Sequence, residues 1–393
     1  MPYLQVDDGD LKQKGALFTA MEIAGQPVLW QKIYEMISLR RKDIEEFLAP
    51  LLSLPSLRII LTGAGSSAFI GEAAQGIVQE STGKLTHAIA TTDLITHPKL
   101  HFQRNIPTLM VSFSRSGNSP ESLAAVEIAD DYCDQIHHLI ITCNRDSALT
   151  YRKLHHAFYL ILPEQANDQS LAMTGSFTGM LLAILLIIRL QSIEAMQASV
   201  ETLVDQTQYL LDELLPQIVA LASQPYRRII FLGSGPLLGI ARECHLKVQE
   251  LSDGQVICKH DSFLGFRHGP RAVVNSESLI VYLFSDDPVV GLYERDLSVS
   301  IDQDGQHVPT ATWNMPMQKL DHSVLDITLA NYHDGPNELS FIGAAVVGQL
   351  IGFFQSLYLG LMPDNPSVSG AINRVVQGVT IYPEVLEGKI VGE

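Results

Sequence analysis

Cysteine is scarce in this chain of 393 residues, and no two of the four cysteines stand in a Cys-x-x-Cys spacing. The sequence shows no metal-ligand cluster, and no hydrophobic signal region opens it. We therefore expect Cys133, Cys143, Cys244 and Cys258 to be reduced thiols without a chemical role, in a cytoplasmic protein.

Positive charge is also in short supply, because 26 lysines and arginines face 43 aspartates and glutamates, for a formal net charge of −17. This balance disfavours nucleic acid and anionic membranes as partners, and an anionic ligand would need a local positive potential. Long apolar runs are missing too. The longest, residues 180–188, ends at Arg189 and falls short of the roughly 20 residues that a membrane-spanning helix needs. We expect a buried helix there.

What the chain does have is a duplicated pattern. Residues 58–65 return 170 positions later as residues 228–235, with the same Arg-Ile-Ile run and Gly-x-Gly turn. The apolar run 108–114 is echoed by 279–285 at an offset of 171. Short β-branched runs alternate with helical patterns in each half, which predicts two similar α/β domains, each doubly wound around a parallel sheet.

Three segments follow from this duplication. Residues 1–40 form a helical segment that precedes the repeat. Residues 41–215 form the first domain, and residues 216–393 form the second domain with a C-terminal loop. A polar helix over 196–215 is expected to link the two halves.

The turn 114–119, Ser-Arg-Ser-Gly-Asn-Ser, lies between an apolar run and a helix-like stretch that starts at Pro120. Ser119 is a good N-cap and Pro120 suits the first helical position, so free amides and the positive end of the helix dipole should converge on this turn. Three hydroxyls add neutral donors that suit a small phosphomonoester. A polar strand-to-helix turn without a ligand explains the same residues about as well.

A second turn of this kind shifts the balance toward a ligand. The apolar run 58–62 ends in Gly-Ala-Gly-Ser-Ser, followed by a helical pattern over 68–80. In an open parallel sheet, both turns would face one crevice if their strands are neighbours. A dinucleotide fingerprint is the alternative, but the acid expected about 20 residues on is met only by the later Asp93.

The second half carries different chemistry. Glu243, Lys247 and Glu250 stand at spacings of four and three, which places them on one face of the helix after Gly235. His268 follows in a Gly-Pro turn that could present its imidazole. These groups would supply a base, an electrostatic stabiliser and a proton shuttle for carbon-acid chemistry beside a carbonyl. A solvated charged stripe and a surface histidine are the plainer interpretation.

Together these motifs resemble the tandem sugar isomerase (SIS) proteins over nearly the whole chain, from residues 21–27 to residues 373–379. Segments 62–71, 116–122 and 265–270 are most similar to the AgaS family of galactosamine-6-phosphate deaminase/isomerases, also labelled tagatose-6-phosphate ketose/aldose isomerases. The resemblance implies two SIS domains with three-layer αβα architecture.

The resemblance also implies a division of roles between the halves. The implied phosphate and sugar contacts are Ser66, Ser67, Ser114, Arg115 through its backbone, Ser116, Ser119, Leu171 and Ala172. Glu250 would move a proton between C1 and C2, Lys247 would support it, and His268 would open the sugar ring. In the family this histidine reaches across a subunit interface, which implies a homodimer or a higher homo-oligomer.

The implied reaction converts galactosamine 6-phosphate to tagatose 6-phosphate and ammonia, with a sugar phosphate as the only ligand and with no cofactor or metal. Two departures from the related glucosamine-6-phosphate synthase limit the implied chemistry. Met1-Pro2 offers no cysteine nucleophile, which argues against glutamine-dependent amination, and residues 370–374 offer no lysine, which argues against a Schiff base between the protein and the sugar. A plain aldose–ketose isomerase and a phosphosugar-sensing regulatory protein remain the alternatives.

Overall fold

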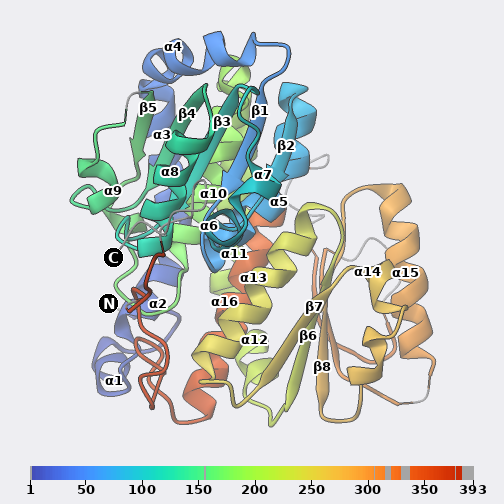
Figure 1. Cartoon of the computed structure of the whole chain (residues 1–393). Coiled ribbons are helices and arrows are strands. Elements are labelled where there is room, and N and C mark those ends of the chain that lie inside the picture. The colour runs from blue at the N-terminus through green and yellow to red at the C-terminus, as the bar shows by residue number, and fades with distance from the viewer. Residues whose placement is uncertain are drawn as a thin grey trace.

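The computed structural model describes residues 2–154, 156–304, 306–314, 320–328, 337–376 and 378–382. It contains two parallel five-stranded sheets, one in each half of the chain, and Figure 1 shows them in two separate lobes. The first sheet has the order β2-β1-β3-β4-β5, with β1 Arg58–Thr62, β2 Leu85–Ala88, β3 Thr108–Ser114, β4 Ile136–Thr142 and β5 Ala157–Ile161. The second has the order β7-β6-β8-β9-β10, with β6 Arg228–Gly233, β7 Ile257–Asp261, β8 Ser278–Leu283, β9 Thr310–Trp313 and β10 Ser323–Ile327.

The two strand orders are the same once β6 is matched with β1, so the predicted duplication and the doubly wound fold are confirmed. The pairing of residues between strands defines the offset between the two halves better than the sequence alone. Arg58 pairs with Thr108 in the first sheet, and Arg228 pairs with Ser278 in the second. The offset is therefore 170 for both strands, and the offset of 171 for the second segment was one residue too long.

Helices surround both sheets. In the first half they are α1 Asp8–Gln13, α2 Leu17–Ala24, α3 Gln26–Leu39, α4 Arg41–Leu52, α5 Ser66–Thr82, α6 Thr91–Thr96, α7 Pro98–His101, α8 Pro120–Tyr132, α9 Ala148–Tyr151, η1 Glu164–Ala166, α10 Gly175–Ile187, η2 Leu190–Ser192 and α11 Met196–Tyr209. The others are η3 Leu210–Leu214, α12 Leu215–Ala222, α13 Pro236–Leu251, α14 Phe263–Phe266, η4 Pro270–Val273, α15 Pro288–Asp302, η5 Ser340–Ile342 and α16 Gly343–Tyr358.

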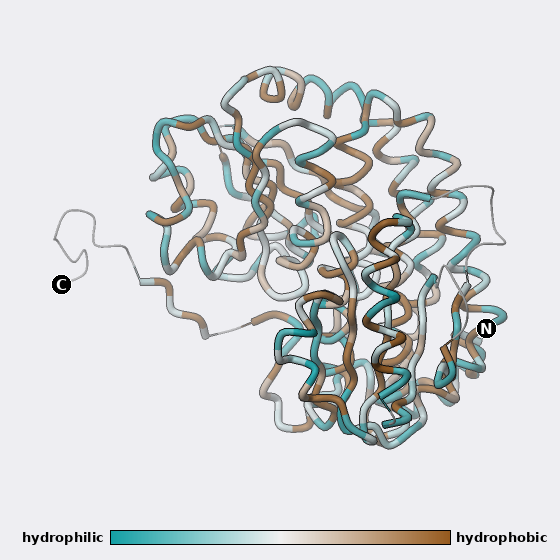
Figure 2. Tube along the Cα trace, turned by 90° about the vertical axis from the view of Figure 1, so that its right-hand side faces the viewer, coloured by the Kyte–Doolittle hydropathy of each residue, from teal (hydrophilic) through white to brown (hydrophobic). Residues whose placement is uncertain are grey.

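The inner faces of both sheets share one hydrophobic core. Leu61 and Val111 of the first sheet and Phe231 and Val281 of the second belong to the same buried cluster, together with α5, α10, α13 and α16. The outer faces have separate cores, one under α8 and one under α14 and α15. Figure 2 shows the matching concentration of hydrophobic residues in the central helices. Each strand is thus covered on both sides, which explains why β3 and β8 are apolar along most of their length.

Helices α5 and α13 join the halves at the centre of the molecule (Figure 1). They approach so closely that a Cβ on Gly239 would lie 2.5 Å from the backbone nitrogen of Ala73. Glu72 and Arg242 form an ion pair across this contact, and they stand 170 positions apart. Residues that are equivalent in the duplication therefore meet each other, which indicates a pseudo-two-fold axis between the two helices.

One described helical stretch, Ser340–Tyr358, is long and apolar enough by composition to cross a membrane, but 89% of it is buried inside the protein. It is a core helix, as is α10, the buried helix expected over 180–188. The expected linking helix is α11, which continues through η3 into α12, so the predicted boundary at 215/216 falls at the start of α12. The domain boundaries stay predictions, and residues 383–393 of the second domain lie outside the described residues.

Candidate active site

Two glycine- and serine-rich turns lie next to each other at the carboxyl edge of the first sheet, because β1 and β3 are neighbours. The strand order reverses between them, and a crevice for ligands opens at such a point. Helix α5 begins at Ser66 after the first turn, and α8 begins at Pro120 after the second. The amides of two helix starts are therefore available at one crevice.

The first turn requires glycine at two positions. Gly65 has φ 57° and ψ −130°, a backbone conformation that residues with a side chain avoid. A Cβ on Gly63 would lie 2.5 Å from the carbonyl carbon of Ser67. The turn is tight, and the two serines at the start of the helix that follows it, Ser66 and Ser67, are each 5% exposed.

The second turn folds around its own hydroxyls. Ser114 Oγ accepts a hydrogen bond from Gly117 N at 3.0 Å, and Ser116 Oγ accepts one from Asn118 N at 3.3 Å. Each hydroxyl keeps its proton for donation to a phosphate oxygen. Ser119 is the N-cap residue of α8 as predicted, but its hydroxyl donates to Ser122 Oγ at 2.7 Å and does not cap the helix.

Residues 171–174, which are expected to line the site, lie beside the first turn. The Ser67 hydroxyl lies 3.8 Å from Met173 Sδ, which places this segment beside the first turn. Leu171 and Ala172, the two contacts expected there, are buried. The segment is held in turn by Asp168, whose carboxylate accepts from Thr174 N at 2.8 Å.

The side chain of Arg115 links the second turn to residues 170–171 and to Arg374. The guanidinium is 6% exposed and donates to the carbonyl oxygens of Ser170 at 3.2 Å, Leu171 at 3.1 Å and Arg374 at 2.6 Å. Burial lowers the pKa of Arg115, and Asp168 opposes this. Arg115 and Arg374 thus place two positive charges beside the second turn in a chain of net charge −17.

The charged face of α13 is a buried network and not a solvated stripe. Lys247 Nζ lies 2.5 Å from Glu250 Oε2 and 3.4 Å from Glu243 Oε1. The side chains of Lys247 and Glu243 are 1% and 0% exposed, and that of Glu250 is 23% exposed. Glu250 is therefore the member of the network that a ligand in the crevice can reach.

Burial sets the protonation of this network. Burial raises the pKa of Glu243 to about 7, and Lys247 opposes that shift. Burial alone would lower the pKa of Lys247, but the carboxylates of Glu243 and Glu250 outweigh it and raise that pKa. Lys247 is thus a fixed ammonium that holds the Glu250 carboxylate in one orientation.

The network faces the turns of the first half. The side chain of Ser66 lowers the pKa of Glu243, the charge of Arg115 lowers the pKa of Lys247, and the carboxylate of Glu250 raises the pKa of Arg115. The crevice is therefore composite, because one half supplies hydroxyls and amides and the other supplies the acid–base groups. Neither half alone contains both sets.

His268 stands apart from this cluster within one chain. It is exposed in the turn between α14 and η4, where its backbone nitrogen donates to Gly265 O at 3.0 Å. Among the described residues of the single chain, no hydrogen bond or ion pair joins its imidazole to Lys247 or Glu250. Of the expected acid–base residues, Lys247 and Glu250 therefore meet in the described structure, whereas His268 lies outside their cluster.

Sequence reasoning missed Glu22, Asp168 and Arg374, whose contacts hold residues 167–174 in place. Glu22 of α2 accepts from Gln169 N at 2.5 Å and from the Ser170 hydroxyl, and burial, together with Asp168, raises the pKa of Glu22 to about 8. Arg374 donates through Nε to Asp168 O at 2.8 Å. These contacts join segments more than 140 positions apart, so no local spacing could have indicated them.

Comparison with known proteins places this geometry in context. Residues 54–190 match the family model of the SIS domain. The chain is similar to D-galactosamine-6-phosphate deaminase AgaS of Shewanella sp. (strain ANA-3), with 41% identity over 95% of this chain and 94% of that protein. It is 37% identical to the Escherichia coli protein of the same name, over 93% of this chain and 96% of that protein.

Among solved structures, the chain is similar to tagatose-6-phosphate ketose/aldose isomerase from Escherichia coli. The TM-score is 0.83 at 34% identity, covering 94% of this chain and 97% of that one. The similarity extends over both sheets and therefore over both contributors to the crevice.

Proposed function

We propose that this chain, which belongs to the AgaS family of SIS-domain proteins, is an enzyme that converts galactosamine 6-phosphate to tagatose 6-phosphate and ammonia. Two relatives named D-galactosamine-6-phosphate deaminase are 41% and 37% identical to this chain, and the similarity covers almost their whole length. A phosphosugar ligand fits the two hydroxyl-rich turns at the helix starts.

The observation that carries the reaction type is the contact of 2.5 Å between Lys247 Nζ and Glu250 Oε2. A carboxylate held by a buried ammonium is a positioned base, and it stands on the half of the molecule that faces the phosphate turns. With the phosphate held by Ser67, Ser114, Ser116 and Ser119, the other end of the sugar extends toward Glu250.

The proposed steps follow from this placement. His268 moves a proton to the ring oxygen so that the hemiacetal opens to an aldehyde with an amine on C2. Glu250 removes the C2 proton and returns it to C1, and a second proton passes from the C2 nitrogen to the C1 oxygen, which leaves a CH₂OH group at C1 and an imine at C2. Water then adds to the imine carbon, ammonia leaves, and tagatose 6-phosphate remains. No lysine of the protein is required, because the substrate brings its own nitrogen.

The test measures ammonia and ketose phosphate together. The purified full chain is given galactosamine 6-phosphate and, in parallel, glucosamine 6-phosphate. We expect ammonia and tagatose 6-phosphate in equal amounts from the first sugar. Absence of ammonia from both sugars would overturn the deaminase.

A plain aldose–ketose isomerase is the second candidate, because the similar Escherichia coli structure carries the name tagatose-6-phosphate ketose/aldose isomerase. The same Glu250 would move the proton, with a hydroxyl in place of the amine on C2. Galactose 6-phosphate as substrate separates the two. Conversion to tagatose 6-phosphate without any ammonia from the amino sugars would favour this candidate.

The position of His268 leads to a proposal about assembly. An exposed imidazole outside the cluster of its own chain fits a homo-oligomer in which each subunit lends His268 to a neighbour's crevice. Mixing inactive Glu250→Gln and His268→Ala chains under conditions of subunit exchange should restore part of the turnover, because mixed dimers contain one intact site. Failure of exchanged mixtures to regain activity would contradict the shared site.

A cytoplasmic location, with no nucleic acid or membrane partner, remains the prediction from composition.

A further inference from the structure

A cavity lies at the amino edge of the first sheet, at the opposite end of β1 from the crevice. Its volume of ≈ 680 Å³ is within the range of small-molecule sites. Because β1 has five residues, roughly 13 Å of strand separates this cavity from the crevice. We call it the amino-edge pocket. It is lined by Pro55, Ser56, Leu57, Arg58, Gly83, Lys84, Leu85, His87, Leu100, Gln103 and Ile106.

The charge of this pocket is opposite to that of the whole chain. Arg58, Lys84 and His87 line it, and none of the described lining residues is an aspartate or a glutamate. The chain as a whole has 43 acidic residues against 26 lysines and arginines. A cavity with two fixed cations, one imidazole and no carboxylate in its lining is therefore a local region of positive potential, which attracts anions.

The basic groups have polar atoms that the protein leaves without a partner. Arg58 donates through Nη1 to the carbonyl oxygen of His101, but its buried Nε has no hydrogen-bond partner among the described residues, and neither has the buried Nδ1 of His87. Lys84 Nζ donates to Leu54 O at 2.8 Å, which uses one of its three donors. Buried polar atoms without a partner are costly, and the oxygens of a bound anion would accept from such groups.

The pocket also has an apolar side that faces solvent. Leu85 and Leu100 line it, and they are 59% and 77% exposed. Ile106, a third lining residue, is only partly buried. Exposed apolar side chains that gather beside a cavity mark a place where a ligand or partner covers them. The lining therefore suits an anion that carries an apolar part.

The second half lacks this combination of groups. Arg58 has an equivalent in Arg228, which donates through Nη1 to Val273 O at 3.1 Å, so each arginine binds a carbonyl of a neighbouring segment. The positions 170 residues after Lys84 and His87 are a glycine and an isoleucine. The duplicated framework explains the arginine, but it does not explain the lysine and the histidine that only the first half adds.

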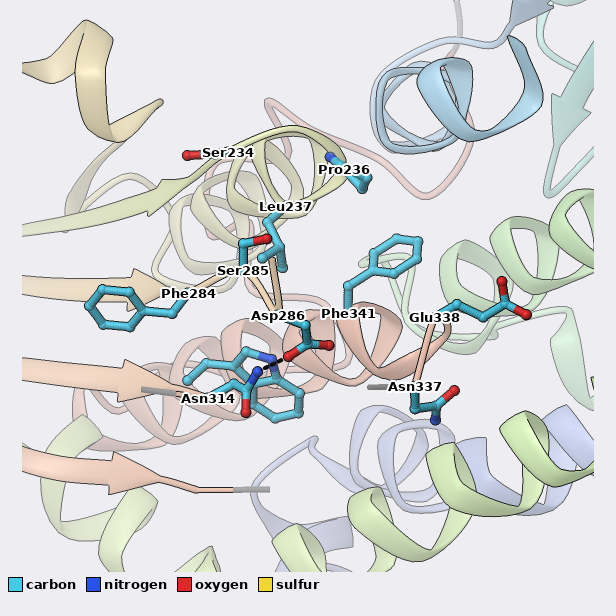
Figure 3. A pocket seen from close by; sticks show the side chains of 11 residues that line it. Ser234, Pro236, Leu237, Phe284, Ser285, Asp286, Asn314, Asn337, Glu338 and Phe341 are labelled. Carbon is cyan, nitrogen blue, oxygen red and sulfur yellow. Dashed lines mark hydrogen bonds between the residues drawn. The ribbon is translucent and has the colours of Figure 1, made fainter. Parts of the chain in front are cut away.

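The cavity at the carboxyl edge of the second sheet offers a contrast (Figure 3). It holds ≈ 130 Å³, and two carboxylates, those of Asp286 and Glu338, line it. The Asn314 amide donates to Asp286, and the Ser285 backbone amide already donates to Glu294 Oε2 at 2.8 Å. That cavity is small and acidic, so of the two the amino-edge pocket is the one that suits an anion.

We propose that the amino-edge pocket binds a phosphomonoester, with Arg58, Lys84 and His87 around its phosphate and Leu85 and Leu100 against its organic part. Guanidinium and ammonium groups form charge-assisted hydrogen bonds with phosphate oxygens. A volume of ≈ 680 Å³ leaves room for more than the phosphate group itself. The site is separate from the crevice, and binding there needs no turnover, so the proposal does not depend on which sugar the crevice converts.

The test is calorimetric titration of the full chain with phenyl phosphate, a phosphomonoester with an apolar ring. Lys84→Gln removes a charged donor, so binding should weaken by about tenfold or more. Gln103→Glu adds a negative charge at an exposed lining position, and binding should weaken by about fivefold or more. Gln255→Glu adds the same charge at the exposed position equivalent to Leu85 in the second half, and it should leave binding unchanged.

Two further measurements identify where the probe binds. Ser116→Ala weakens the proposed phosphate turns of the crevice, and the affinity of the amino-edge pocket should not respond to it. Inorganic phosphate should bind to the pocket more weakly than phenyl phosphate, because it leaves the two leucines uncovered. Thermal unfolding of each variant, measured alongside, shows whether lost binding comes with an intact fold.

Four results would overturn the proposal. The first is the absence of saturable binding of phenyl phosphate to the wild-type chain. The second is an affinity that falls in Ser116→Ala and is unchanged in Lys84→Gln and Gln103→Glu, because the probe would then occupy the crevice. The third is an equal loss in Gln103→Glu and Gln255→Glu, which would trace the effect to net charge alone. The fourth is inorganic phosphate binding as tightly as phenyl phosphate, which would contradict an organic ligand.

Discussion

The turn after the first strand has the same backbone in both halves but different side chains. Gly65 has φ 57° and ψ −130°, and Gly235 has φ 56° and ψ −128°. After this shared glycine the first half continues with two serines, whereas the second continues with Pro236 and Leu237. The duplicated framework was thus kept while its polar groups diverged. In our proposal, one half kept the phosphate turns and the other acquired the acid–base groups.

The largest difference between the halves is expected when the equivalent glutamates of α5 and α13 are replaced. Glu80 lies 170 positions before Glu250 and is exposed, whereas Glu250 joins the Lys247 network. Replacing Glu250 with glutamine should lower kcat by roughly 10²- to 10⁴-fold, because a positioned acid–base group is lost. Glu80→Gln should leave kcat unchanged. Near-normal turnover of Glu250→Gln in the ammonia assay would exclude Glu250 as the base.

The phosphate turns provide the next largest contrast. Replacing Ser116 with alanine removes a hydroxyl donor of the proposed phosphate site, and KM should rise by about tenfold or more because a hydrogen bond to a charged group is lost. Asp286→Ala, at the equivalent position of the second half, should leave KM unchanged. Steady-state kinetics of both variants measures this difference. A KM that rises only in Asp286→Ala would mean that the phosphate binds in the second half.

Sequence predicted these two turns because their signals are local. A run of apolar residues, a Gly-x-Gly turn and a helix start all lie within about ten positions, and α5 begins only two residues before the predicted stretch at 68–80. The support for the crevice depends instead on distant contacts. Arg115 reaches Arg374 across 259 positions, and Glu22 reaches Ser170 across 148. No periodicity reports such pairs, because they form only when separate elements pack together.

The divergence of the second half could also be predicted only in part from the sequence. The loss of serines after Gly235 is visible in the sequence, and it predicts the loss of the phosphate site. The capture of a turn amide by Glu294 is not visible, because the acid lies nine residues further on, inside α15. A buried glutamate in a helix has many possible partners, and only the packing of α15 against the sheet selects one.

The shared glycine conformation offers a sharper test of the framework itself. A Cβ on Gly65 or on Gly235 would have no atom within 4 Å, so alanine meets no clash and suffers only backbone strain. Such strain costs on the order of 1–3 kcal/mol, and we expect similar losses in the free energy of unfolding for Gly65→Ala and Gly235→Ala. Only Gly65→Ala should also raise KM, because it moves Ser66 and Ser67. If urea unfolding shows a lower free energy of unfolding for only one of the two variants, the two turns are not equivalent.

The smallest expected effect tests the pseudo-two-fold axis. Glu72 and Arg242 are equivalent residues that pair with each other, and their side chains are 29% and 40% exposed. Reversing either charge alone should destabilise the protein by about 1 kcal/mol at most, since partly exposed pairs contribute little. Reversing both should restore the ion pair, because the axis exchanges the two helix positions.

The restoration should nevertheless be incomplete, for a reason that the duplication itself supplies. The Arg242 guanidinium also lies 4.5 Å from the centre of the Phe69 ring. The residue equivalent to Phe69, 170 positions later, is Gly239, so an arginine at position 72 would find no ring beneath it. The double reversal should therefore fall short of the wild type by the cation–π contribution, about 0.5–1 kcal/mol. Complete recovery in urea unfolding would mean that the ring contributes nothing, whereas no recovery over the single reversals would mean that the two positions are not related by the axis.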